Sequence, residues 1–386
     1  MSTNLAAAHQ FYRNGSRLRV LNESNLNLLT LIDITMRNRL LNLGGRDLHL
    51  MKSYLTPNYV QRTILTNSAF DFVELWLSSR KEAKQGNALY YWKQAKNFYI
   101  ATKSLEIDSQ PLTAYYCCLN AAKALLGLKN VNLTNISHGV SSARGDTKGN
   151  ILKDKIIYAG SGVLWELSRL LGESTAKEEY LLKDLFYNIP CIHRTFTVTF
   201  SDCAELFIPV NDIVFEQMND GSRNVYARFQ IDEKYANGHV KRYIPRVFEE
   251  TLKEEKDLFY RLKKRFKWDI HKPIADRKMA LTEYHVKIRK LFYYISGNSM
   301  LWYIKKDLPG NNSIIQRSQI TLIYGVFHWL SELVRYNPIA FSKMLSSRQN
   351  WLIKEFVEIG LSQFIDEISC EITGCNIMRT GYKNLS

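Results

Sequence analysis

The segment Pro111–Leu128 (PLTAYYCCLNAAKALLGL) constrains the fold more than any other part of the chain. Apolar or small residues cover most of its helical circumference, and Asn120 and Lys123 interrupt them. A helix with so wide an apolar surface lies inside a protein rather than on its surface. A buried amide or ammonium group costs about 1–3 kcal/mol or more unless it finds a partner. The sequence therefore predicts a central helix whose few polar groups have specific partners.

Length and composition narrow the fold class. The chain has 386 residues, which is enough for two or three domains. Its composition, 46% hydrophobic and 23% charged, is that of an ordinary globular protein. The small numbers of proline (8) and glycine (19) favour long helices with few elaborate turns. We therefore predict a mainly α protein.

The chain is strongly basic, with a net charge of +15. The excess is clustered, because residues 241–290 contain 16 basic and 8 acidic residues, and residues 1–66 contain 8 and 3. A clustered positive charge favours a phosphate-rich or otherwise acidic partner, and we expect RNA or another nucleic acid. A basic protein without such a partner is the alternative interpretation.

The sequence contains no pattern typical of a membrane segment or an export signal. No run of 18 apolar residues occurs, and the first residues lack a continuous apolar stretch. The six cysteines do not have zinc-ligand spacing, and Cys117 and Cys118 lie in the apolar helix, where they act as small hydrophobic residues. We expect a cytoplasmic protein with reduced thiols, no metal site and no membrane contact.

Changes of pattern divide the chain into four parts. Alternating residues in Thr195–Phe200 and Asn224–Ile231 predict short strands, whereas the charged stretch from Pro245 to Lys267 predicts a long helix. The predicted parts, in order, are a basic N-terminal helical extension (1–66), a helical bundle (67–194), a small inserted antiparallel β-sheet (195–240) and a basic C-terminal helical domain (241–386).

Several blocks of the sequence together resemble the YaaC-like family of bacterial proteins. The similarity covers roughly residues 70–370 and rests on Trp92–Tyr99, Pro111–Leu126, His138-Gly139, Gly162–Gly172, Asp184–Pro190, His193-Arg194, Leu333–Pro338 and Trp351–Phe356. Within it, a Tyr-Tyr pair followed by Ala-Ala-Lys-Ala-Leu-Leu resembles the second helix of HEPN-like bundles. The resemblance implies a HEPN-like helical bundle core. By analogy it also implies a role linked to RNA or to bacterial antiviral defence, and a homodimer with two active sites across its interface.

HEPN ribonucleases use an Arg followed, after four to six residues, by a His. The Arg binds the scissile phosphate, and the His handles the proton of the ribose 2′-hydroxyl without a metal ion. The segment from Arg265 to His271 has this spacing and lies in the most basic part of the chain. We therefore predict Arg265 and His271 as the catalytic pair of a metal-independent endoribonuclease, although about one such match arises by chance in a chain of this composition.

His138 is the second candidate for the catalytic residue. It follows the central helix after a polar loop. It either faces a cleft as a base or phosphate ligand, or packs at the start of the next helix. The residues predicted to bind nucleic-acid phosphates are Arg261, Lys263, Lys264, Lys267 and Arg194. Aromatic pairs such as Tyr115-Tyr116 are predicted to be core residues, and Arg335 is predicted to stack on an aromatic ring or to pair with a carboxylate at a helix end.

Motifs of several enzyme classes are missing from the sequence. It contains no phosphate-binding Walker A loop, no dinucleotide-binding glycine motif, no His-Glu-x-x-His and no Gly-x-Ser-x-Gly. We therefore expect no cofactor. The alternative to a ribonuclease is a non-catalytic interaction subunit that docks a partner protein, such as an ATPase or another effector.

Overall fold

The computed structural model describes residues 38–85, 87–142, 149–231, 235, 238–251, 258–297 and 300–380. The longer helices are α3 (Ala69–Ser78), α5 (Ala88–Ser104), α6 (Gln110–Leu128), α7 (Val163–Leu170), α11 (Ile274–Arg289), α12 (Gln319–Tyr336), α13 (Pro338–Leu345) and α15 (Leu361–Thr373). The shorter ones are α4 (Lys81–Gln85), α8 (Leu182–Tyr187), the 3₁₀ turn η2 (Pro190–Ile192), α9 (His193–Thr199), α10 (Gly238–Lys241), α14 (Asn350–Glu355) and the π-helical segment η4 (Phe356–Gly360).

The strands are short in the first half of the chain and longer in the second. They are β1 (Arg39–Leu40), β2 (Asn42–Leu43), β3 (Arg46–Asp47), β4 (Ile64–Leu65), β5 (Val140–Ser142), β6 (Lys155–Tyr158), β7 (Glu178–Leu181), β8 (Phe207–Gln217), β9 (Asn224–Ile231), β10 (Phe248–Glu250), β11 (Leu258–Leu262), β12 (Phe266–Lys267), β13 (Phe292–Ile295), β14 (Leu301–Lys305) and β15 (Ile377–Met378). Of the predicted N-terminal helical extension, residues 1–37 lie outside the described residues, and residues 38–66 contain β1–β4.

Helix α6 is the central helix that its sequence predicts. It packs against α5, α12 and α15, and most of its residues are fully buried. Its alanines and cysteines are small, so the neighbouring helices can approach closely. Its two polar interruptions are only partly buried, and both have partners. Asn120 Nδ2 donates to the Tyr116 carbonyl oxygen at 2.8 Å, and Lys123 Nζ lies 5.6 Å from the centroid of the Tyr91 ring.

The prediction of a mainly α protein with a small inserted sheet is wrong. The structure contains an eight-stranded antiparallel sheet in the order β10-β11-β9-β8-β14-β13, with β1 paired to β8 and β12 paired to β9. Its strands come from residues 39–40 and 207–305, so the sheet extends far beyond residues 195–240. The helices therefore form one layer beside a large sheet, rather than the bundle core that the resemblance implied.

In the charged stretch of residues 245–267, the described residues form strands β10, β11 and β12 instead of the predicted helix. Glu249 lies opposite Arg261 in the neighbouring strand, and Arg261 Nε donates to Glu249 Oε1 at 2.7 Å. On a partly exposed sheet face, opposite charges pair across strands just as they pair along a helix. A high density of charged residues therefore does not distinguish the two structures.

The opposite error occurs at Thr195–Phe200, where the predicted strand is largely helix α9. The rings of Phe196 and Phe200 lie four residues apart along one helical face, with centroids 5.0 Å apart, and Phe196 also contacts Tyr187. Burial of these rings in the helical core outweighs the strand preference of the β-branched threonines. The other predicted strand, Asn224–Ile231, is confirmed as β9.

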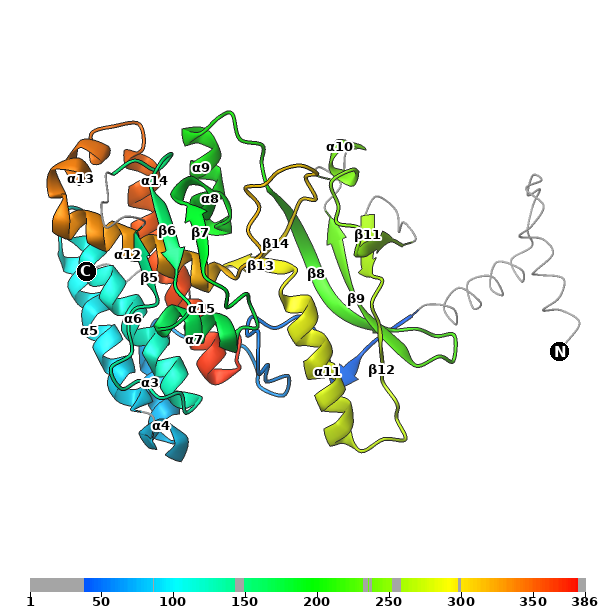
Figure 1. The fold of residues 1–386 in the computed structure, drawn as a ribbon. Helices are drawn as coiled ribbons and strands as arrows, with labels where there is room; N and C mark the ends of the chain where they lie inside the picture. The colour runs from blue at the N-terminus through cyan, green and yellow to red at the C-terminus, as the bar shows by residue number, and fades with distance from the viewer. Residues whose placement is uncertain are drawn as a thin grey trace, which may run out of the picture.

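The two layers have separate hydrophobic cores. One core lies among the helices, and the other lies between the sheet and α11, where Leu281, Tyr284 and Ile288 cluster with Phe215 and Phe229. Figure 1 shows the helices gathered on one side of the molecule and the sheet on the other, with α11 running beside β8. The junction between the two layers is therefore where segments distant in sequence meet.

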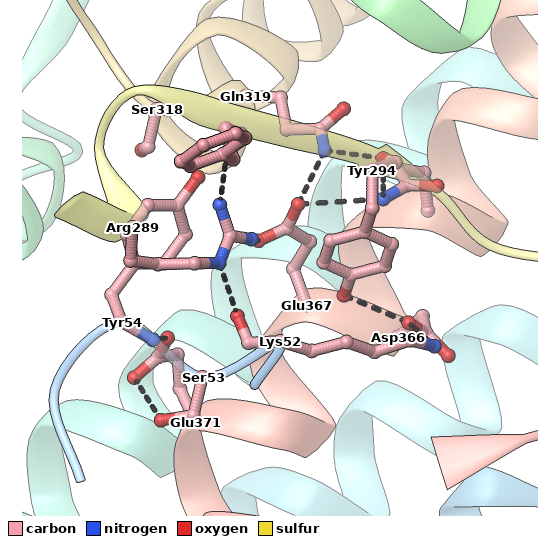
Figure 2. A network of polar contacts seen from close by, with 12 residues as sticks. Lys52, Ser53, Tyr54, Arg289, Tyr294, Ser318, Gln319, Asp366, Glu367 and Glu371 are labelled. Atoms are coloured by element: carbon pink, nitrogen blue, oxygen red, sulfur yellow. Dashed lines mark hydrogen bonds and ion pairs between the residues drawn. The ribbon is translucent and has the colours of Figure 1, made fainter. Parts of the chain in front are cut away.

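A buried network of charged side chains joins the layers (Figure 2). Lys52 Nζ donates to Asp366 Oδ2 at 2.9 Å and to the Ile377 carbonyl oxygen at 2.6 Å. Arg289, at the end of α11, donates to the Lys52 carbonyl oxygen at 2.8 Å, and its Nη2 lies 3.7 Å from Glu367 Oε2. Because the carboxyl groups come from α15, the network fixes the helical layer to α11 and to the segment around Lys52.

This network holds one more carboxyl group than cations. Its cations are Lys52 and Arg289, and its carboxyl groups are Asp366, Glu367 and Glu371, all of them buried. Burial, opposed by Arg289 and reinforced by the neighbouring carboxyl groups, raises the pKa of Glu367 to about 7. Burial also raises the pKa of Glu371. One proton shared among the three carboxyl groups leaves two cations facing two negative charges, which balances the charge of the network.

Candidate functional site

Two glycines hold the loop that carries His138 against the start of helix α7. Gly139 and Gly162 have positive φ angles of +80° and +105°. A Cβ atom on Gly162 would lie 2.5 Å from the Gly139 nitrogen, so no side chain fits there. This close approach allows the Leu164 N–H to donate to the His138 carbonyl oxygen at 3.1 Å. The backbone of His138 is therefore fixed by the first turn of α7.

Hydroxyl groups from two helices fix the side chain of His138. The Tyr115 hydroxyl, from α6, is hydrogen-bonded with His138 Nδ1, and the two rings stack with centroids 5.5 Å apart. The same hydroxyl lies 3.3 Å from that of Tyr324, on α12, which donates to the His138 carbonyl oxygen at 3.3 Å. Burial raises the pKa of both tyrosines, so both hydroxyls keep their protons. Nε2 of His138 has no hydrogen-bond partner among the described residues.

With the proton of His138 on Nδ1, all three hydrogen bonds of this cluster can form. His138 Nδ1–H donates to Tyr115, the Tyr115 hydroxyl donates to Tyr324, and the Tyr324 hydroxyl donates to the His138 carbonyl. His138 Nε2 then carries a lone pair and can accept a proton. Burial lowers the pKa of His138, and the charges of Lys123 and Arg335 lower it further. The imidazole is therefore neutral at neutral pH.

Two cations lie close enough to act on His138. Arg335 Nη2 donates to the Tyr116 hydroxyl at 3.0 Å, and its guanidinium lies 5.9 Å from the centroid of that ring. Lys123 lies over the Tyr91 ring, and burial lowers the pKa of Lys123. Cations held on aromatic rings at the edge of the protein suit the binding of an anion beside a neutral imidazole.

The inner wall of the site comes from His328 and Glu332 on α12. The His328 ring centroid lies 5.9 Å from that of His138 and 5.1 Å from that of Tyr115. Burial lowers the pKa of His328 to about 3, so this ring is also neutral. Glu332 accepts a hydrogen bond from Ser142, and burial raises the pKa of its carboxyl group. This wall is packed, and His138 is the histidine that reaches the surface.

Arg265 and His271, the predicted catalytic pair, make no contact with each other in the part of the chain that is described. Arg265 lies in the turn between β11 and β12, 3.3 Å from the Met218 sulfur and 3.6 Å from Glu249. His271 lies exposed after β12, where its backbone N–H donates to Asp269. Within the described residues, no hydrogen bond orients the His271 ring.

The predicted phosphate ligands divide into paired arginines and exposed lysines. Arg261 is paired with Glu249 at 2.7 Å, and Arg194, at the start of α9, lies 3.6 Å from Glu205. The three predicted lysines in and beside the turn between β11 and β12 are exposed: Lys263, Lys264 and Lys267. An exposed lysine can contact a phosphate without breaking an ion pair, so these lysines are better placed for nucleic-acid contact than Arg261 or Arg194.

The contribution of α12 to the His138 site is not predicted from the sequence. Tyr324, His328 and Arg335 are separated by four and seven residues, which places them on one face of a helix. Polar side chains at helical spacing within an otherwise apolar segment are the sequence pattern that could have identified these residues. The predicted stacking of Arg335 on an aromatic ring is confirmed by its position over Tyr116.

Comparisons with known proteins give one match. A family model described as YaaC-like Protein matches residues 49–372, a range that contains every residue of the His138 site. No curated protein and no solved structure matches the chain. Among the described residues, no helix has the length and apolar character needed to cross a membrane. The same residues contain no cluster of His, Cys, Asp and Glu able to hold a metal ion.

Proposed function

The chain belongs to the YaaC-like protein family, and we propose that it binds RNA and cleaves it at the His138 site without a metal ion. The observation that carries this proposal is the half-buried His138. Its neutral ring is fixed by Tyr115, and its Nε2 is unbonded within range of Lys123 and Arg335. Attack of a ribose 2′-hydroxyl on phosphorus is catalysed by a positioned neutral base beside cations, and this is the arrangement around His138.

In the proposed reaction His138 acts first as a base and then as an acid, and the two cations stabilise charge. Nε2 of His138 takes the proton of a ribose 2′-hydroxyl, whose oxygen attacks the adjacent phosphorus. Arg335 and Lys123 stabilise the negative charge that develops on the phosphate oxygens. The bond between phosphorus and the 5′ oxygen breaks, and the imidazolium returns its proton to that oxygen. The products are a 2′,3′-cyclic phosphate and a 5′-hydroxyl, and His138 is again neutral.

The basic surface supports the binding half of the proposal. The chain carries a net charge of +15, and the exposed lysines beside β12 present their charges to solvent. Each phosphate that such a lysine neutralises makes binding more sensitive to salt. We expect Lys264→Gln and Lys267→Gln to weaken RNA binding and to reduce its salt dependence, while leaving the cleavage rate of bound RNA unchanged.

Cleavage of labelled total RNA and tRNA in EDTA tests the catalytic half. The variants to compare are His138→Asn, Tyr115→Phe and His271→Ala, with circular dichroism to verify their folding. We expect His138→Asn to abolish cleavage and Tyr115→Phe to reduce it, because the ring loses the hydroxyl that orients it. We expect His271→Ala to cleave like the wild type.

Other outcomes assign the function differently. Loss of cleavage in His271→Ala alone would place catalysis at Arg265 and His271 and overturn the His138 proposal. RNA binding without cleavage by the wild type would favour the alternative, a non-catalytic interaction subunit with a partner protein. A role in antiviral defence, which the family resemblance implies, stays a prediction.

A further inference from the structure

A cavity lies in the sheet layer and shares no residue with the His138 site. Its volume is about 710 Å³, within the range of small-molecule sites. Its walls come from the hairpin β2–β3 and the residues after it, from residues 59–63, and from β8 and β14. It therefore forms where the first described segment of the chain lies beside β8.

An irregularity in β8 shapes one wall of this cavity. The pairing of β8 with β9 shifts between Asn211 and Val214, and Asp212 has a positive φ of +46°. A non-glycine residue in this conformation is strained, and bulges of this kind are common beside binding sites. His49, which bridges to Val214, lines the same cavity. Asn211 and Asp212, at this irregularity, both line the cavity.

Two largely buried residues of the cavity wall each have a side-chain hydrogen-bond donor without an acceptor among the described residues. Asn376 is 9% exposed, and its Oδ1 accepts the Lys52 N–H at 2.8 Å. Its Nδ2 has no acceptor among the described residues. Trp302 is 7% exposed, and its indole N–H also has no acceptor within the described part of the chain. Both residues line the cavity. Donors held at a cavity wall without acceptors favour a ligand rich in acceptor oxygens.

Charged residues of both signs line the cavity, and its two arginines can bind an anion. Arg46 and Arg62 both line the cavity, and Arg46 Nη1 donates to the Val60 carbonyl oxygen at 3.1 Å, which holds its guanidinium in place. Two aspartates also line the cavity. The carboxylate of Asp47 accepts a hydrogen bond from Asn42 within the hairpin, and Asp212 is exposed at the irregularity of β8. Two guanidinium groups beside neutral donors are a typical arrangement for a phosphate group.

We propose that this cavity binds a phosphate-bearing small molecule of about mononucleotide size. Arg46 and Arg62 bind the phosphate, and Asn376 and the indole N–H of Trp302 bind acceptor atoms of the rest of the molecule. The apolar parts of Trp302 and Tyr59 provide the surface against which a planar group packs. This binding is independent of the proposed cleavage of RNA, because the two sites belong to different cores.

Isothermal titration calorimetry with AMP, ribose 5-phosphate, inorganic phosphate and adenosine tests the proposal. We expect AMP to bind at least about tenfold more tightly than adenosine, because only AMP carries the phosphate. Arg62→Gln should weaken AMP binding about tenfold or more, and Trp302→Phe, which keeps a ring but removes the N–H, should weaken it several-fold. Arg348→Gln, the same change at an exposed residue that lines neither site, should leave AMP binding unchanged.

The two proposed sites are separated by one further variant. AMP should bind His138→Asn as it binds the wild type, whereas AMP binding that His138→Asn abolishes would assign it to the RNA site and overturn this proposal. Failure of all phosphate-bearing probes to bind the wild type would also overturn it. AMP binding that Arg62→Gln leaves unchanged would overturn the proposal as well. None of these results depends on whether the protein cleaves RNA.

Discussion

Replacing Glu367 by glutamine should remove a pH dependence from the stability of the protein. Glu367 is fully buried on α15, where its Oε1 accepts hydrogen bonds from Gln319 at 2.5 Å and from Gln363 at 3.3 Å. The amide oxygen of glutamine can accept both bonds, and the side chain has the same shape. The variant therefore removes the ionisation of this group while keeping most of its contacts.

The direction and size of the effect follow from the shift of the carboxyl group. Burial raises the pKa of Glu367 from 4.5 to about 7. Below pH 4.5 the group is protonated in both the folded and the unfolded chain, so it contributes no pH dependence. Between these two values the unfolded chain is ionised while the folded protein keeps its proton, so the free energy of unfolding falls as pH rises. At about 1.4 kcal/mol per pH unit, the total fall is about 3 kcal/mol, and it is complete near pH 7.

Urea denaturation of the wild type and Glu367→Gln between about pH 5 and about pH 8 measures this difference. Relative to the variant, the wild type should lose about 3 kcal/mol of stability across this range. Glu358→Gln, the same change at an exposed position near the start of α15, is the matched control and should keep the pH dependence of the wild type. Parallel curves for the wild type and Glu367→Gln would refute the raised pKa and the charge balance inferred for the network.

Three further predictions follow from the geometry. Gly162→Ala should lower the free energy of unfolding, measured by urea denaturation, by more than about 2 kcal/mol, because a Cβ would clash with the Gly139 backbone. The control Gly221→Ala, with φ +77° and open space around it, should lower it by about 1 kcal/mol. Equal losses would contradict the close contact between Gly162 and Gly139. Trp92→Phe should lower the free energy of unfolding by about 1–2 kcal/mol, because the buried carbonyl of Phe70 loses the indole donor at 3.0 Å. An unchanged melting temperature would argue against that hydrogen bond. If His138 is the base, RNA cleavage should persist below pH 6.5, since burial and the nearby cations lower the pKa of His138. A cleavage rate that falls to half its maximum above pH 6.5 as the pH is lowered would count against His138.

The helices were the most predictable part of the fold. The apolar positions of α6 and α12 repeat with helical spacing, and α6 occurs where the sequence places it. The sheet was not predictable in the same way, because β10 and β11 carry charges on their partly exposed face and so resemble a solvated helix. Strand β1 pairs with β8 through residues far apart in the chain, Arg39 with Gln217. The residue pattern within one segment does not specify which distant strand will pair with it.

The candidate site was predictable only in part. His138 could be singled out, because a histidine followed by glycine after a polar loop is a recognisable feature of the sequence. Its hydroxyl partners could not be identified, since Tyr115 is 23 residues away and Tyr324 is 186 residues from the carbonyl it contacts. Spacing alone favoured Arg265 and His271, which are close in sequence but are not brought into contact within the described residues.

The sequence by itself determined which segments bury an apolar face and that the surface is basic, because periodicity and net charge are properties of neighbouring residues and of composition. Only the tertiary structure decided what covers each face. It brought Lys52 to Asp366, 314 residues away, and His138 to Tyr115 and Tyr324. The physical reason is that a buried polar group requires a partner, but the group's own segment does not specify which distant residue will meet that requirement.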